Sequence, residues 1–385
     1  MPSLDDMVRA TEPTETPRRK RSDIPDGMSY EWDGRTGSLT TAPLAERPTT
    51  WDDQIRDAGL DPEEVEVIEP VQVRGWDAMQ AGGSVVRMHY YRLNLQRRTP
   101  GLDIDDLLEA AQKNTPPAPT LTLNPDSAYL VALGDLQLGK VDGDGVEGTV
   151  QRFFDTTALA VERYRREFAG SPVYLVHLGD CIEGFMSQGG ANAWRTTLTT
   201  TEQVRLYRRL LLHQVQAFAA VAPEVVMVGV PGNHDEAHRP LHTYGDSWAI
   251  DAVSAVAETL EVAGGYEHVK LLAPERDELT ITLDICGTIT TMAHGHQFGN
   301  GVEGWKNWWQ GQGFGQNAPG ESALLLAAHK HHLRIVEEGP RTFVQVPALE
   351  SESTWYRHKT GTVGRPGIVT ALVGGGSWSR MEVLR

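Results

Sequence analysis

The sequence predicts an α/β fold in which strands that end in polar side chains alternate with helices. Two observations lead to this prediction. Five short apolar runs are each closed by residues that can bind a metal or transfer a proton. Helical patterns at Val150–Phe168, Thr201–Val221 and Ser247–Leu260 follow the first three of these runs. This βαβ rhythm is typical of a sheet covered by helices on its faces.

The run at 225–236, VVMVGVPGNHDE, shows the pattern most clearly. A continuous apolar run closed by turn residues is typical of a buried strand. Open α/β folds place their ligands beyond the carboxyl ends of such strands. Here the run ends in Asn233, His234 and Asp235. Taken alone, this segment is equally well explained by an ordinary turn.

Four other runs have the same construction. They are 129–133 before Gly-Asp-Leu-Gln, 173–178 before Gly-Asp-Cys-Ile-Glu, 288–293 before His-Gly-His, and 324–328 before His-Lys-His-His. All five runs therefore deliver carboxylate, amide or imidazole groups at the same end. Separate accidents would not be expected to produce this order, so the sequence predicts one shared functional site.

In this order, the motifs resemble those of the calcineurin-like metallophosphoesterase superfamily, from Asp126 to the C-terminus. The resemblance implies a four-layer sandwich, in which two mixed β-sheets are flanked by helices. It also implies a binuclear metal-dependent phosphoesterase. Two divalent ions about 3.5–4 Å apart can hold a phosphate and a water molecule for in-line attack.

The resemblance further implies a ligand set. Asp180 would bridge the two ions, because a shared carboxylate offsets the repulsion between two dications. The first ion would take Asp135, Gln137, Asp180 and His331, and the second would take Asp180, Asn233, His294 and His329. Mixed oxygen and imidazole ligands favour Mn²⁺, with Fe, Zn and Mg²⁺ as alternatives.

Gln137 departs from the superfamily pattern, which usually has histidine at this position. An amide oxygen is a weaker and harder donor than imidazole. Two interpretations follow. Either Gln137 is a ligand and the first site prefers Mn²⁺ or Mg²⁺, or Gln137 is not a ligand.

By the same resemblance, His234 is the catalytic histidine and not a ligand. It would protonate the leaving oxygen or stabilise charge on the phosphate. Glu183 and Asp235 compete for the task of orienting His234. Each also has a simpler interpretation, since Glu183 could face solvent and Asp235 could fix the turn. His296 and His332 are expected beside the ions.

The net charge of −17 argues against a surface that binds a polyanion everywhere. A nucleic-acid substrate would depend on bound metal and a local basic patch. Two arginines typical of Ser/Thr phosphatases are missing, one after Gly179-Asp180 and one at Val230-Pro231. The resemblance therefore favours the SbcD-type nuclease and phosphodiesterase branch of bacteria and phages, acting on DNA or RNA.

Two alternative functions remain open: a phosphodiesterase for cyclic or small dinucleotides, and a catalytically degenerate binding protein. The resemblance to SbcD-type nucleases implies a possible separate ATPase partner, and no Walker-type loop occurs in the chain itself. Only two cysteines and no long apolar run are present, which predicts the bacterial host cytoplasm and no membrane.

Three regions are expected: a disordered tail at 1–48, a small α+β accessory module and linker at 49–120, and the phosphoesterase domain at 121–385. The accessory module should contain a helix at Thr50–Gly59 and a hairpin within 65–96. In the segment 299–320, Trp305, Trp308 and Trp309 have helical spacing. Core packing is the simpler interpretation, and a lid that stacks on a base is the alternative.

Overall fold

The computed structural model of the chain forms two compact units, Arg9–Gly101 and Met1–Val8 with Leu102–Arg385. Among the described residues, no helix has the length and apolar character needed to cross a membrane. The described residues are 25–32, 36–79, 83–97, 108–109, 112–113, 124, 126–185, 196–237, 243–299, 301, 303–351, 357–358, 361 and 363–385.

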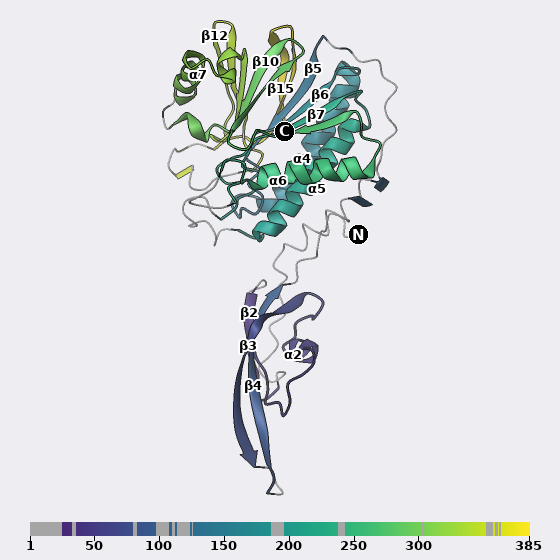
Figure 1. Cartoon of the computed structure of the whole chain (residues 1–385), viewed down its shortest axis with the longest axis vertical. Helices are drawn as coiled ribbons and strands as arrows, with labels where there is room; N and C mark the ends of the chain where they lie inside the picture. The colour runs from purple at the N-terminus through teal and green to yellow at the C-terminus, as the bar shows by residue number, and fades with distance from the viewer. Residues whose placement is uncertain are drawn as a thin grey trace. The chain divides into compact units, whose positions relative to one another are not determined.

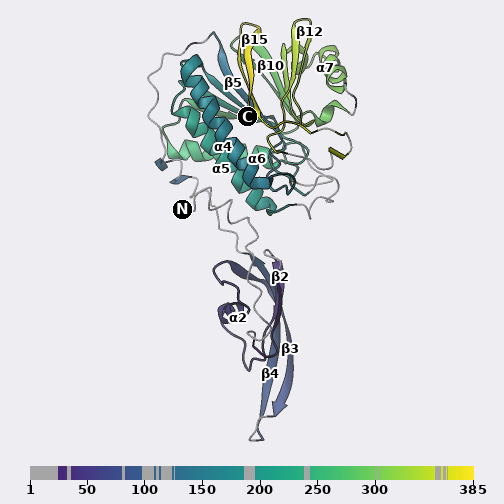
Figure 2. The same cartoon turned by 180° about the vertical axis from the view of Figure 1, so that it is seen from behind.

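Two mixed sheets form the centre of the larger unit (Figures 1 and 2). The six-stranded sheet has the order β15-β14-β5-β6-β7-β8, with β5 to β8 parallel. Its strands are β5 Ala128–Leu133, β6 Val173–His177, β7 Val225–Gly229, β8 Val269–Leu272, β14 Ile368–Gly374 and β15 Ser377–Leu384. The five-stranded sheet has the order β12-β13-β11-β10-β9. Its strands are β9 Thr280–Ile285, β10 Thr288–Ala293, β11 Leu324–Ala327, β12 Arg334–Glu338 and β13 Arg341–Gln345.

Helices cover the outer faces of both sheets (Figure 1). The six-stranded sheet packs against α4 Gly145–Arg163, α5 Thr200–Ala219 and α6 Trp248–Ala263, and the five-stranded sheet packs against α7 Gly304–Phe314. Alternate residues of β5 face the helices and the space between the sheets, so β5 is buried on both faces. The predicted four-layer sandwich is confirmed, and double burial explains the continuous apolar runs.

The helices agree with the sequence pattern. The prediction at 150–168 corresponds to α4 and the π-helical turn η2 Tyr164–Phe168 that continues it. At the start of α5, Thr199 and Glu202 form a capping box, which satisfies two backbone N–H groups. At the start of α6, the side chain of Ser247 accepts a hydrogen bond from the backbone N–H of Ala249.

His177 lies fully buried at the end of β6 and links the sheet to α5. Its Nε2–H donates to Oε1 of Gln214 at 2.8 Å, so Nδ1 accepts from the hydroxyl of Tyr207 at 3.0 Å. Burial lowers the pKa of His177 to about 4. His177 is therefore a neutral core residue whose two ring nitrogens both have hydrogen-bond partners.

We expect this pKa to make the unfolding free energy depend on pH. The unfolded chain binds a proton near the ordinary pKa of 6.5, but the folded chain binds it only near 4. The contribution of His177 to the unfolding free energy is fully present above pH 6.5. It is lost as the pH falls toward 4, which lowers the unfolding free energy by up to about 3 kcal/mol. Urea unfolding of the wild type and of His177→Gln, measured across this range, checks the prediction. Equal pH slopes for the two proteins would contradict it.

The smaller unit contains a four-stranded antiparallel sheet with the order β1-β2-β4-β3. Its elements are β1 Ser29–Trp32, β2 Thr36–Thr40, α2 Asp52–Asp57, β3 Val65–Met79 and β4 Val85–Arg97. The predicted hairpin and helix are confirmed, although Thr50 is not the helix cap. The expected disorder of 1–48 is wrong for β1 and β2, since both strands pair in the sheet. The expected linker at 114–123 lies outside the described residues.

Candidate metal centre

The loops that follow β5, β6, β7, β10 and β11 are joined by hydrogen bonds. The backbone N–H of Gln137 donates to the carbonyl of Asp180 at 2.9 Å, and the N–H of His234 donates to Asp180 Oδ1 at 2.8 Å. The N–H of His329 donates to Asp135 Oδ2 at 2.9 Å. The loops that carry the predicted residues therefore come together at the carboxyl ends of these strands.

Five of the predicted ligands have left-handed backbone conformations. The φ angles are 51° for Asp135, 41° for Gln137, 50° for Asp180, 70° for His329 and 57° for His331. Residues other than glycine rarely adopt positive φ, and such conformations concentrate at functional sites. The loops thus hold these side chains at an energetic cost that the surrounding packing must offset.

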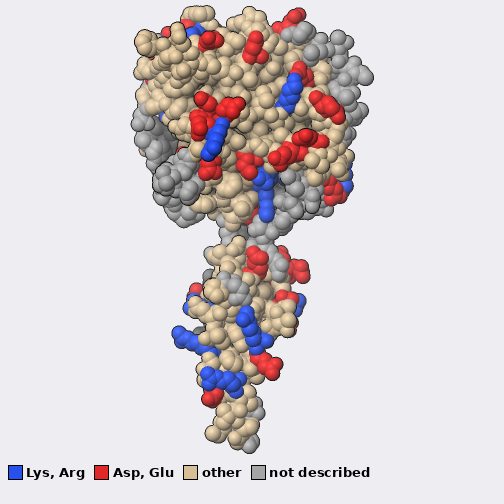
Figure 3. Space-filling model, viewed as in Figure 1, with Lys and Arg blue, Asp and Glu red and all other residues tan. Residues whose placement is uncertain are grey.

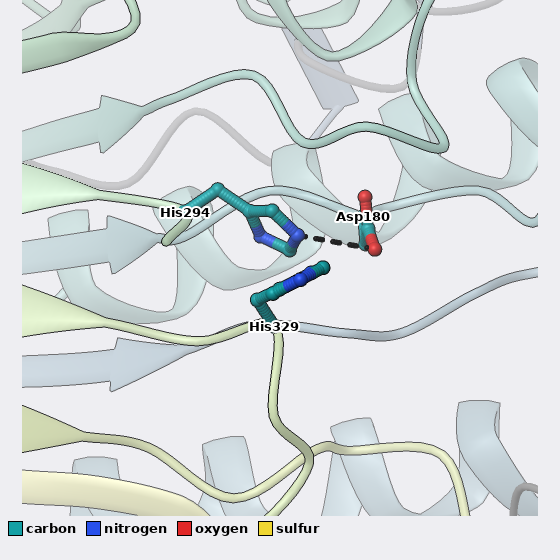
Figure 4. Close-up of side chains that lie close together, drawn as sticks. All are labelled: Asp180, His294 and His329. Carbon is teal, nitrogen blue, oxygen red and sulfur yellow. Dashed lines mark ion pairs between the residues drawn. The ribbon is translucent and has the colours of Figure 1, made fainter. Parts of the chain in front are cut away.

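The centre of the cluster is formed by Asp180, His294 and His329 (Figure 4). One possible ligand atom from each lies within 4.8 Å of the others. His294 Nδ1–H donates to the carbonyl of Leu178 at 2.7 Å, so its other nitrogen, Nε2, faces Asp180 Oδ2 at 3.1 Å. Two electron pairs facing each other at this distance require a proton or a metal ion between them.

The electrostatics of the imidazoles agree with this requirement. Burial disfavours the charged form of His294, but the Asp180 carboxylate outweighs burial and raises its pKa to about 9. Burial and the neighbouring His294 lower the pKa of His329 to about 3. His329 is therefore neutral, which is the form that binds metals.

Buried acceptors without hydrogen bonds provide a second test of metal binding. Among the described residues, Asn233 Oδ1 at the second position and Asp135 Oδ1 at the first are buried and have no hydrogen-bond partner, and His294 Nε2 has none besides its ion pair with Asp180 Oδ2. Unsatisfied buried polar atoms are costly and require an explanation. Residues Asp180, Asn233, His294 and His329, predicted for the second ion, therefore fit a divalent transition-metal ion.

The residues predicted for the first ion fit less completely. His331 Nε2 lies 3.4 Å from Asp135 Oδ1, while its Nδ1 contacts Glu350 Oε1 at 2.9 Å. A carboxylate on the far nitrogen is the usual support for a metal-binding histidine. Gln137 differs, because its Oε1 accepts a hydrogen bond from Lys140 Nζ at 2.7 Å. The sequence did not single out Lys140 or Glu350.

His234 lies beside the cluster without joining it. Its Nε2 is 4.0 Å from Asp180 Oδ2, and its side chain is 12% exposed. Nδ1–H donates to the backbone carbonyl of Glu183 at 2.9 Å, with the Glu183 carboxylate 3.5 Å away. Burial opposes a charge on His234, but Asp180 and Glu183 raise its pKa to about 9. Nε2 is thus directed to the site and carries a transferable proton.

Glu183 and Asp235 have different positions relative to His234. Glu183 is buried and orients the ring mainly through its backbone carbonyl, so the solvent-facing alternative is wrong. Asp235 Oδ1 accepts from the backbone of Cys181 at 2.9 Å, and Oδ2 accepts from Gly232 at 2.9 Å. These bonds join two loops, which supports the turn-fixing interpretation of Asp235 over a catalytic one. Burial and the nearby Asp180 raise the pKa of Asp235 to about 6.

The loops approach so closely that a side chain at Gly232 is excluded. A Cβ atom there would lie 2.2 Å from both the nitrogen and Oδ1 of Asp180. At Gly179, which has a φ of +82°, a Cβ would lie 2.6 Å from the nitrogen of Gly232. Gly179 of the Gly-Asp motif and Gly232 of the Gly-Asn-His-Asp motif thus allow the Asp180 loop and the His234 loop to meet.

The remaining candidates lie around the cluster. The ring centroid of His296 is 5.4 Å from that of His294 and 6.3 Å from that of His329. His332 Nδ1 contacts the carbonyl of Lys330 at 2.7 Å. In α7, Trp305 and Trp309 are 5% and 3% exposed, and Trp305 stacks on Phe343. The core-packing interpretation of α7 is confirmed for these two indoles.

Comparisons with known proteins give weak similarities. No family model matches the sequence, and no curated protein matches it. Among solved structures, an archaeal phosphodiesterase shares 11% identity at a TM-score of 0.32, over 66% of this chain and 99% of its own. A predicted phosphoesterase from Streptococcus pneumoniae shares 11% identity at a TM-score of 0.28, over 67% of this chain and 89% of its own. Vacuolar Protein Sorting 29 from Cryptosporidium parvum shares 13% identity at a TM-score of 0.32, over 67% of this chain and 98% of its own. At these TM-scores the similarities add nothing to what the geometry of the site shows.

Proposed function

We propose that the chain is a metal-dependent phosphodiesterase of the calcineurin-like metallophosphoesterase superfamily. One observation carries the proposal: a non-ligand imidazole, His234, directs Nε2 toward Asp180 at 4.0 Å. Asp180 in turn belongs to the group Asp180, His294 and His329, which fits a divalent ion. Proton donor and ion site thus lie at the distance that a single phosphate group can span.

The side chains divide the work of hydrolysis. Asp180, Asn233, His294 and His329 would hold a divalent ion, which would polarise a phosphoryl oxygen and make water a better nucleophile. His234 gives its Nε2 proton to the leaving oxygen as the ester bond breaks. The carbonyl of Glu183 fixes the ring orientation, and the Glu183 carboxylate, 3.5 Å from Nδ1, stabilises the imidazolium before transfer. Asp235 keeps the two loops together.

For the substrate, we favour a nucleic-acid strand over a small nucleotide, on the evidence of the smaller unit. In β3 and β4, Trp76 stacks on Tyr90 with ring centroids 4.5 Å apart. Arg74 pairs with Tyr90 in the register and Arg92 lies two residues further along β4, so both arginines share the face of the aromatic pair. Arg74 and Arg92 are exposed. The alternate residues of β4, such as Tyr91 and Leu93, belong to the hydrophobic core on the opposite face.

This face combines the two groups that bind single strands without sequence preference. Bases stack on aromatic rings, and arginines contact the phosphates. Figure 3 shows Arg side chains together with Asp and Glu side chains on the smaller unit, and the whole chain has a net charge of −17. Positive charge for a polyanion would come from Arg74 and Arg92 on this face.

The first experiment compares hydrolysis of bis-p-nitrophenyl phosphate and p-nitrophenyl phosphate by Mn²⁺-loaded protein. A preference for the diester supports the proposal, and a preference for the monoester would indicate a phosphatase. Absence of turnover for both would favour a binding protein without catalysis.

The second experiment tests the substrate class with Trp76→Ala. We expect weaker binding of fluorescent single-stranded DNA, by roughly 5- to 150-fold, because one stacked base contributes about 1–3 kcal/mol. Hydrolysis of bis-p-nitrophenyl phosphate should stay unchanged. Val73→Ala, at an exposed position on the opposite face of the same strand, is the matched control. Equal DNA affinity of Trp76→Ala and the wild type would instead favour a small-nucleotide phosphodiesterase.

A further inference from the structure

Lys140 is a nearly buried cation next to the residues predicted for the first ion. It follows Gln137 by three residues, and its backbone N–H donates to the carbonyl of Gln137 at 3.1 Å. Its ammonium group lies 2.7 Å from Gln137 Oε1 and 3.1 Å from Glu350 Oε1. The side chains of Lys140 and Glu350 are 11% and 5% exposed. The contacts of Lys140 with Gln137 and Glu350 are therefore buried within the site and are not a surface ion pair.

The contact determines which way the Gln137 amide faces. An ammonium group has only donors, so it must be met by the carbonyl oxygen of the amide and not by the NH₂ group. The oxygen is the one atom of glutamine that can bind a hard cation. Lys140 therefore holds the only possible ligand atom of Gln137.

Glu350 extends the same arrangement to His331. Its Oε1 contacts Lys140 Nζ at 3.1 Å and His331 Nδ1 at 2.9 Å, and His331 Nε2 faces Asp135 Oδ1 at 3.4 Å. A fixed positive charge thus stands two side chains away from Asp135. Like charges in a low-dielectric environment repel strongly, so the ammonium group disfavours a dication next to it.

We infer that Lys140 is a positioning residue that removes Gln137 from the ligand set, so that this centre binds one divalent ion tightly per chain. The tight ion takes the position of Asp180, Asn233, His294 and His329, where buried acceptors lack partners. At the first position, Asp135, His331 and the bridging Asp180 remain without a fourth protein ligand. The inference rests on the metal centre of the proposed function and specifies its stoichiometry.

Metal analysis of the whole chain tests this inference independently of activity. Protein equilibrated with Mn²⁺ and separated from free metal should retain one ion per chain, with the EPR signal of isolated Mn²⁺. Lys140→Met should bind a second ion at least about tenfold more tightly than the wild type does, in line with the effect of residues that support metal ligands. The second ion should produce the exchange-coupled signal of a metal pair.

Lys306→Met is the matched control, because Lys306 of helix α7 pairs with Glu338 away from the predicted ligands. It should retain one ion, and Lys140→Gln provides a second test if Lys140→Met does not fold. Two tightly bound ions in the wild type, or one ion in both Lys140 variants, would overturn the inference and leave the proposed function standing. A wild type that binds no ion would overturn both.

Discussion

Asp180→Ala is expected to lose the divalent ion and at least about 10³-fold in kcat/KM for a diester, because a bound ion contributes several kcal/mol to the transition state. Asp180 is the only carboxylate in the group with His294 and His329. Its Oδ1 also accepts the N–H of His234 at 2.8 Å. One substitution therefore removes both the negative charge of the site and the bond that positions the catalytic loop.

Isothermal titration with Mn²⁺ and steady-state kinetics with bis-p-nitrophenyl phosphate measure the two losses. Asp155→Ala is the matched control, because Asp155 is an exposed aspartate on α4 that contacts Gln151. Asp180→Asn keeps an oxygen for the His234 N–H and should fold normally while it still loses most of its Mn²⁺ affinity. Retention of wild-type Mn²⁺ affinity in Asp180→Asn would show that the ion binds elsewhere.

His234→Ala is expected to lower kcat by about 10²- to 10⁴-fold, the usual contribution of a positioned proton donor. Binding of Mn²⁺ should remain, since His234 Nε2 stands 4.0 Å from Asp180 and the ring is held by the carbonyl of Glu183. The two variants thus separate the functions of the site. Asp180→Ala removes the ion together with activity, whereas His234→Ala removes activity alone.

The leaving group reveals whether His234 acts by proton transfer. A good leaving group such as p-nitrophenolate needs little protonation, so the loss should be smaller for bis-p-nitrophenyl phosphate than for a dinucleotide. His332→Ala, a histidine whose Nδ1 contacts the carbonyl of Lys330, should change neither rate greatly. The same loss with both leaving groups would assign His234 a purely electrostatic role.

The sequence predicted that the residues of the candidate metal centre lie together, because local chemistry and strand order point to the same place. Each apolar run is a strand buried on both faces, and parallel strands bring their carboxyl ends to one edge. That argument places Asp135, Asp180 and His234 without any knowledge of tertiary contacts. It also predicts the helices between the strands, because their capping residues and apolar periodicity are local signals.

The contacts around Gln137 could not be predicted in the same way. Glu350 reaches the site from the segment after β13, and no pattern at its position in the sequence marks it. Its backbone N–H donates to the carbonyl of Asp135 at 3.1 Å, a partner more than two hundred residues away. Lys140 is closer in sequence, but a lysine in a polar loop normally faces solvent.

The short strands β1 and β2 were missed for a related reason. They contain four and five residues, and their order depends on pairing with β4 and on a core shared with α2. Strand propensity depends strongly on such tertiary partners. A short polar segment next to a tail rich in Thr, Pro and Arg therefore carries little signal of its own.

The left-handed conformations at Asp135, Gln137, Asp180, His329 and His331 also limit how this centre can be altered or copied. A β-branched residue at any of these positions would meet a backbone that it cannot adopt without strain, whatever its side chain could bind. Transplanting the side chains onto the ends of straight strands in another scaffold would not reproduce their directions. An engineer who wants this centre elsewhere has to carry over the loops themselves, with Gly179 and Gly232 included.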